Sequence, residues 1–167
     1  MANNSYPSRT RALTFTVVLA VSALVAAQSG NAAKINDLTG TWLTTNTASG
    51  PGAPPGPFLA LNTFTKDGNI IAPNQGESAC CPLNTPAQGR WKKIGVRTFA
   101  ITFIAINYNP DASLAGLLKV RQTITLNGSS TEFNATGIVD VMDPGGNPLA
   151  TFQVATHGVR IEVEPLP

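Results

Sequence analysis

The sequence predicts an all-β fold: an eight-stranded antiparallel up-and-down β-barrel that follows an N-terminal signal peptide. Three observations support this fold. After residue 37, apolar and polar residues alternate and Thr, Val, Ile and Phe are abundant, as in half-buried strands. Turn sequences divide this part of the chain into eight segments. The connections between these segments are alternately long and short, which is typical of a barrel with one elaborated end.

The N-terminal segment has the pattern of a secretory signal. Arg9 and Arg11 precede an uncharged apolar run at residues 12–27, which is shorter than the roughly 20 residues that span a bilayer. Small residues follow, so we expect cleavage after Ala27, with sites up to Ala33 as alternatives. Export to the periplasm or the extracellular space would then leave no membrane-spanning segment. An uncleaved N-terminal anchor is the competing interpretation.

The predicted domain organisation is a signal peptide at 1–27, a linker at 28–37 and one barrel domain at 38–164. The eight predicted strands span residues 40–47, 57–65, 70–73, 89–94, 97–108, 116–127, 131–143 and 148–164. The last strand is expected to kink at Gly158. Closing such a meander into a barrel removes exposed strand edges.

The connections predict which end of the barrel is open. In an up-and-down meander, successive connections lie at opposite ends, and the short ones here are tight hairpin turns. The long, Gly- and Pro-rich connections all fall at the other end, at residues 48–56, 74–88, 109–115 and 144–147. Long loops on a rigid scaffold often carry a binding site, so this end is the predicted mouth.

The charge of the chain excludes one class of partner. The formal net charge of +2 comes from the two arginines of the predicted signal, so the exported chain is neutral. A neutral surface gives no general attraction for nucleic acid or anionic membranes. We therefore expect no nucleic-acid partner. The sequence does not predict an oligomeric state.

A Gly-Thr-Trp triplet at residues 40–42 opens the first predicted strand at the tight-turn end. The last strand finishes at the same end, and barrel closure places it beside the first. Arg160, late in the last strand, can therefore stack on the indole of Trp42. Both residues are predicted to be structural and to close the floor of the barrel.

These features carry a family resemblance over residues 38–164. The motifs are Gly40-Thr41-Trp42, Phe64-Thr65-Lys66-Asp67-Gly68, Gly89-Arg90-Trp91 and Arg160-Ile161. The chain resembles the lipocalins and the wider calycin group, and more closely small exported bacterial lipocalin-like proteins. The resemblance implies a barrel whose interior holds a small molecule. The chain lacks the disulfide between distant segments and the helix after the barrel that larger lipocalins have.

The alternation within the strands predicts the lining of the interior. Lys119 and Arg121 point outward, so Gln122 points into the barrel. Small residues such as Ala105, Ala135 and Gly137 leave room inside. The predicted ligand-binding residues, four phenylalanines and one amide, are Phe99, Phe103, Gln122, Phe133 and Phe152. The alternative is a filled core in which Gln122 bonds to Thr44 or Asn46.

The sequence shows no catalytic constellation. The sole histidine, His157, is predicted to point outward, and no nucleophile motif, phosphate loop, dinucleotide fingerprint or metal-ligand cluster appears. We predict no catalytic residue, no metal site and no cofactor. The preferred function is binding of a small apolar molecule. The alternatives are a cofactor-free cyclase or isomerase of the allene-oxide-cyclase or dirigent type, by fold analogy, and a filled envelope or structural domain.

The two cysteines of the chain, Cys80 and Cys81, are adjacent and fall in the longest predicted loop. Neighbouring cysteines cannot staple distant segments, so their predicted structural role is to shape the mouth. An oxidising compartment favours a strained disulfide between them. Free thiols, an intermolecular link, and a redox or metal role are the other interpretations.

Overall fold

The computed structural model describes residues 37–73 and 83–166. The predicted signal peptide, its cleavage site and the Cys80-Cys81 pair lie outside the described residues. The described chain is all β, as predicted. Its strands are β1 (Gly40–Ser49), β2 (Pro57–Phe64), β3 (Asn69–Ala72), β4 (Leu83–Asn84), β5 (Ala87–Lys93), β6 (Thr98–Tyr108), β7 (Leu114–Leu126), β8 (Glu132–Met142) and β9 (Pro148–Arg160).

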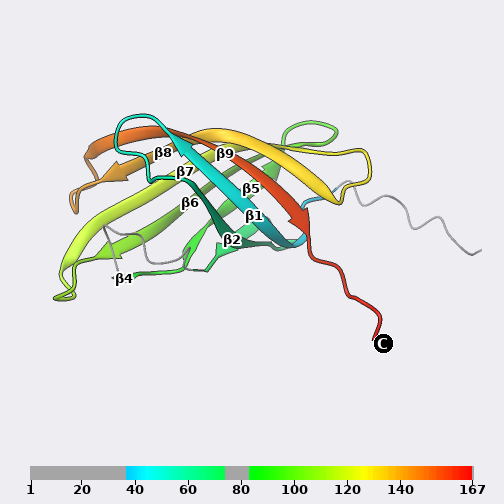
Figure 1. The fold of residues 1–167 in the computed structure, drawn as a ribbon, viewed down its shortest axis with the longest axis horizontal. Helices are drawn as coiled ribbons and strands as arrows, with labels where there is room; N and C mark the ends of the chain where they lie inside the picture. Colours follow the sequence, from blue (N-terminus) through cyan, green and yellow to red (C-terminus); the bar gives the residue numbers. More distant parts are fainter. Residues whose placement is uncertain (1–36, 74–82, 167) are drawn as a thin grey trace, which may run out of the picture. The chain divides into compact units, whose positions relative to one another are not determined.

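Eight of these strands form a closed antiparallel barrel, which confirms the predicted fold (Figure 1). Each strand pairs with the next along the sheet, in the order β1, β2, β3, β5, β6, β7, β8 and β9. The β1–β9 pairing closes the barrel and runs without interruption from Trp42↔Arg160 to Ser49↔Gln153. The first and last strands pair along most of their length, whereas β2 pairs with β3 only at Thr63 and Phe64 among the described residues.

The short strand β4 was not predicted. It pairs with β6, beyond the part of β6 that pairs with β5. Pro86 separates β4 from β5 and has no N–H for the sheet, so this stretch looks like a loop in the sequence. Thr85 maintains the pairing, since its N–H donates to Ile106 O at 2.9 Å and its Oγ1 accepts from Ile106 N at 3.1 Å.

The last strand also differs from the prediction in its length. β9 ends at Arg160 and not at residue 164. The register of β9 with both neighbours continues through Gly158, and the irregularities lie instead at Asn107/Tyr108 and Val141/Met142, near the mouth. The sequence predicted a kink at Gly158, but the strand pairing shows no irregularity there. Gly158 instead provides space for a side chain of the core.

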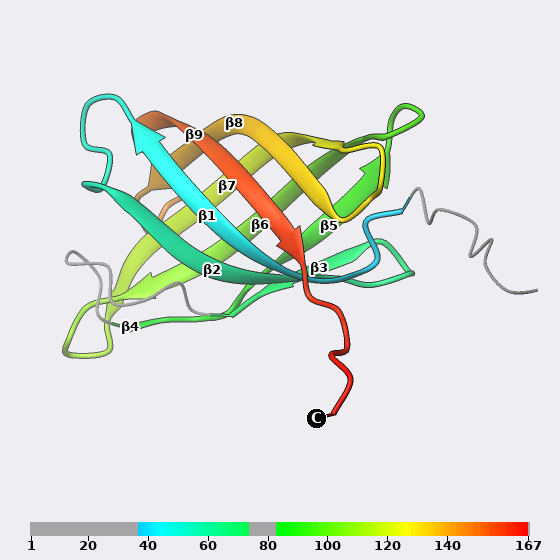
Figure 2. The same cartoon turned by 45° about the vertical axis from the view of Figure 1, so that its right-hand side comes forward.

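The two ends of the barrel differ as the connections predict. Figure 2 shows the β1–β2, β6–β7 and β8–β9 connections together at one end and the β2–β3, β5–β6 and β7–β8 turns at the other. Two mouth turns are held by their own carboxylates: Asp111 accepts from Ser113, and Asp143 accepts from Asn147. These hydrogen bonds hold the pKa of both carboxyls below the ordinary value.

Alternate residues of each strand point inward, as predicted. Most residues predicted to face inward from β6, β7, β8 and β9 are buried, including Phe103, Gln122, Ala135 and Val154, while Gly137 is partly buried. On the outer wall, Asp140 accepts from Thr151 Oγ1 at 2.8 Å and pairs with Arg121. These contacts, led by that of Thr151, lower the pKa of the Asp140 carboxyl.

Gly158 provides the space in which the ring of Phe133 lies. A Cβ atom at this position would lie 2.3 Å from Phe133 Cε1. Phe133 is the register partner of Gly158 on β8 and is fully buried. The ring therefore lies flat against the backbone of β9, and any side chain at residue 158 would displace it.

We expect Gly158→Ala to lower the free energy of unfolding by about 1–3 kcal/mol, because it overpacks the core against Phe133. The matched control is Gly128→Ala, where the nearest atom to a new Cβ is the flexible end of Arg97 at 3.3 Å. That change should stay within about 0.5 kcal/mol. Urea unfolding followed by tryptophan fluorescence measures both. Equal effects would contradict the proposed packing role of Gly158.

Candidate functional site

The closed end of the barrel is built around Trp42 and Arg160. Trp42 is fully buried, and its Nε1 donates to Leu38 O at 2.8 Å. The guanidinium of Arg160 lies 4.2 Å from the centroid of the Trp42 ring. The predicted stacking is therefore present, and it joins the first strand to the last.

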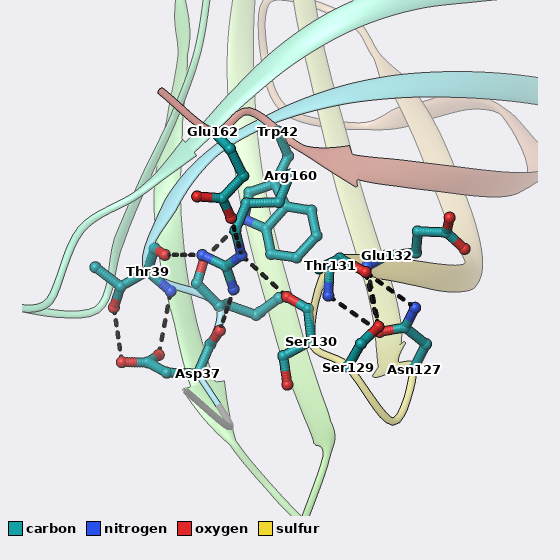
Figure 3. Close-up of polar contacts among 11 residues, drawn as sticks. Asp37, Thr39, Trp42, Asn127, Ser129, Ser130, Thr131, Glu132, Arg160 and Glu162 are labelled. Atoms are coloured by element: carbon teal, nitrogen blue, oxygen red, sulfur yellow. Dashed lines mark hydrogen bonds and ion pairs between the residues drawn. The ribbon is translucent and has the colours of Figure 1, made fainter. Parts of the chain in front are cut away.

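Arg160 also donates hydrogen bonds to three backbone carbonyls (Figure 3). Its Nε donates to Ser130 O at 3.0 Å and its Nη2 to Asp37 O at 2.7 Å, while Nη1 donates to Thr39 O. The Glu162 carboxylate lies 3.9 Å away. Burial lowers the pKa of Arg160, while the charges of Glu162 and Asp37 oppose that shift. One planar side chain thus holds the segment before β1, the β7–β8 turn and the end of β9 together.

The glycine of the Gly-Thr-Trp triplet makes room for this arginine. Gly40 has φ +125°, a conformation that L side chains rarely adopt, and a Cβ there would lie 2.9 Å from Arg160 Nη1. The triplet and the distant arginine therefore form one structural unit, in which Gly40 provides the space and Trp42 the stacking surface.

An aromatic cluster seals the interior above this unit. Trp42 and Phe133 lie 4.9 Å apart between ring centroids, and Phe64 packs edge-on against Phe133 at 6.5 Å. Trp91 extends the cluster to Phe99 at 5.7 Å. Two of the predicted ligand-binding residues, Phe99 and Phe133, thus lie in this floor and have 0% and 1% exposure.

The inward-facing residues nearer the mouth differ from the floor in exposure. Gln122, Phe152 and Ala105 each retain 8% exposure, and Phe103 retains 6%. The remaining three predicted ligand-binding residues, Phe103, Gln122 and Phe152, thus face the interior above this floor. These residues are buried but keep slightly more exposure than Trp42, Phe99 and Phe133 in the floor.

A chain of buried polar side chains crosses the interior between these two halves. Gln122 Nε2 donates to Thr156 Oγ1 at 2.7 Å, and Thr156 Oγ1 donates to Asn46 Oδ1 at 2.8 Å. Asn46 Nδ2 donates to Thr44 Oγ1 at 3.3 Å. The hydrogen-bond partner of Gln122 is therefore Thr156. The filled-core alternative predicted Thr44 or Asn46 instead. Asn46 and Thr44 belong to the same network one step further along.

Asn62 completes this network and was not predicted. Its Nδ2 donates to Thr44 Oγ1 at 3.4 Å, and Thr44 Oγ1 itself donates to Ala60 O at 3.1 Å. The sequence did carry a signal: in the alternating stretch of β2, residue 62 shares its face with Phe64, so an asparagine there had to point inward. We refer to Gln122, Thr156, Asn46, Thr44 and Asn62 as the polar chain.

The polar side chains that face the interior are amides and hydroxyls. These groups hydrogen-bond to a bound molecule without exchanging protons near neutral pH. The histidine lies elsewhere, since His157 Nδ1 meets Asn134 Oδ1 at 3.2 Å on the exposed outer wall. In residues 37–73 and 83–166, no group of His, Cys, Asp and Glu side chains could hold a metal ion. Within the same ranges, no helix is long and apolar enough to cross a membrane.

We expect Arg160→Lys to lower the free energy of unfolding by about 2–4 kcal/mol, because an ammonium cannot bond to three separate carbonyls and stack on Trp42. The matched control is Arg121→Lys, at the ion pair on the outer wall, where the Arg121 side chain is 46% exposed. That pair should contribute only about 0–1 kcal/mol. Chemical denaturation compares the two, and equal losses would contradict the special role of Arg160.

Comparisons with known proteins do not assign this site to a family. No protein-family model matches the chain, and no curated protein matches it.

Proposed function

We propose that this protein is an exported, lipocalin-like barrel that binds one small, largely apolar molecule in the upper half of its interior. The observation that carries the proposal is the change in exposure along the barrel. Trp42, Phe99 and Phe133 of the floor have at most 1% exposure, whereas Gln122, Phe152 and Ala105 keep 8% each. An eight-stranded barrel is wide enough to hold one small ligand where side chains do not fill it.

The lining of the upper half suits such a molecule. Phe103 and Phe152 provide apolar contact, and Gln122 presents an amide whose Nε2 already bonds to Thr156. Apolar walls with a few placed polar groups are typical of small-molecule sites. In this proposal the ligand enters through the long connections and rests above Phe99 and Phe133, which form the floor beneath it.

Export is part of the proposal and comes from the sequence. Arg9 and Arg11, the apolar run and the small residues after it support secretion with cleavage after Ala27. A carrier in the periplasm or outside the cell would meet small apolar molecules that have left a membrane or a neighbouring cell. Native mass spectrometry of protein purified from its own host would detect both the cleavage and a retained molecule.

A steric block tests the open interior directly. We expect Ala105→Phe to weaken binding of the neutral apolar dye N-phenylnaphthylamine at least about 10-fold, because the new ring occupies the upper half. The variant should remain as stable as the parent, since open space accommodates the ring. Fluorescence titration and thermal unfolding measure the two effects.

The control for this block is Ala100→Phe, on the outward face of the same strand, β6. It should leave dye binding unchanged. If the interior is filled, Ala105→Phe would instead overpack it and destabilise the protein by about 1–3 kcal/mol. That outcome, together with no dye binding by the parent, would reject the proposal and favour a filled structural barrel.

A further inference from the structure

Among the described residues, three buried side-chain atoms have no hydrogen-bond partner, namely Asn62 Oδ1, Asn84 Oδ1 and Ser130 Oγ, and only Asn62 belongs to the polar chain. Asn62 Oδ1 has no exposed surface and accepts no hydrogen bond. Asn62 points inward from β2, beside the floor residue Trp42, which is its register partner on β1. Buried polar atoms nearly always find a partner, because leaving one unpaired costs the full penalty of its desolvation. The unpaired carbonyl of Asn62 therefore requires an explanation.

The polar chain cannot satisfy this atom from within. The single hydroxyl proton of Thr44 is given to Ala60 O at 3.1 Å, so Thr44 Oγ1 can only accept from its other neighbours. It accepts from Asn46 Nδ2 at 3.3 Å and from Asn62 Nδ2 at 3.4 Å. These directions fix the amide of Asn62 with its nitrogen toward Thr44, and its oxygen is left as an open acceptor.

Small residues lie near Asn62 along its own strand and on the inward faces of the strands beyond it. Ala60 lies two residues earlier on β2, and the antiparallel register with β3 places Ala72 beside Asn62. Ala72 pairs with Ala87 on β5, and Ala105 faces inward from β6. These four side chains are methyl groups, which fill less of the interior than the aromatic rings below them. Asn62 as a whole retains 5% exposure, so a ligand that enters from the mouth would reach this residue at the base of an apolar wall.

We infer that the ligand of this barrel donates a hydrogen bond to Asn62 Oδ1, so that it is a neutral molecule with a mostly apolar body and a hydroxyl or N–H group. This inference rests on the proposed binding function and narrows its ligand class. A pure hydrocarbon or an ether would leave the carbonyl unpaired. An ionised carboxylate offers only acceptors and would be repelled by it. A donor group at the buried end of the ligand removes the desolvation penalty that the free protein carries.

The test compares ligands that differ only in the donor. Decanol and decyl methyl ether form one pair, and naphthol and methoxynaphthalene form a second pair with a rigid ring. Isothermal titration calorimetry with the full exported protein measures each affinity. At least one alcohol should bind about 10-fold or more tightly than its ether, because a site that pairs with a donor discriminates against the analogue that lacks it.

A variant assigns that preference to Asn62. Asn62→Leu has nearly the same shape and removes the acceptor, so the alcohol and the ether should bind it equally, with the ether unchanged from the parent. Its thermal midpoint should be equal or higher, since removal of an unpaired buried carbonyl outweighs the loss of the long Nδ2 bond to Thr44 Oγ1 at 3.4 Å. The control is Asn134→Leu, the same change on the outer wall of β8, which should keep the preference for the alcohol.

The outcomes separate the two proposals. Equal binding of alcohol and ether by the parent protein would overturn the role of Asn62 and leave interior binding intact, with a water molecule as the partner of Oδ1. A preference for alcohol that survives in Asn62→Leu would also overturn it. Binding of none of the four compounds by the folded parent would count against interior binding itself, and this inference would fail with it.

Discussion

The stacking of Arg160 on Trp42 is the interaction on which the rest of the structure depends. It lies at the point where the last strand meets the first, with the guanidinium 4.2 Å from the ring centroid. Closing a barrel costs chain entropy, because the paired ends are more than a hundred residues apart in sequence, and that cost must be offset locally. Arg160 provides the compensation through one stack and three carbonyl contacts, to Asp37, Thr39 and Ser130.

The packing at the closed end of the barrel determines where space can remain in its interior. The aromatic rings fill the space above Arg160, so any room inside the barrel must lie toward the long connections. The polar chain runs across this boundary from β7 through β9 and β1 to β2, and it ties strands together that are distant in sequence. Its bond from Thr156 to Asn46 spans 110 residues. The same side chains thus stabilise the closed barrel and form the base of its upper half.

Much of this fold could be predicted because strand alternation is a local signal. Lys119 and Arg121 identify the outer face of β7, so Gln122 had to face inward, and it does. The strand β4 could not be predicted, since Pro86 masks a pairing that Thr85 maintains. The hydrogen-bond partners could not be predicted from the sequence either. Alternation places Asn62 inside the barrel, but only the three-dimensional structure shows that the hydroxyl of Thr44 donates to Ala60 O.

In the proposed function, the unpaired carbonyl of Asn62 would give the barrel a means of selecting ligands that its shape alone does not provide. Apolar walls discriminate weakly, since one methylene more or less changes binding by about 1–3 kcal/mol, whereas a buried polar group left unpaired excludes a mismatched ligand more strongly. A leucine at residue 62 would suit a filled core better than an asparagine does, because it would carry no desolvation penalty. An unpaired acceptor beside the floor therefore suits the proposed ligand site better than it suits a filled core.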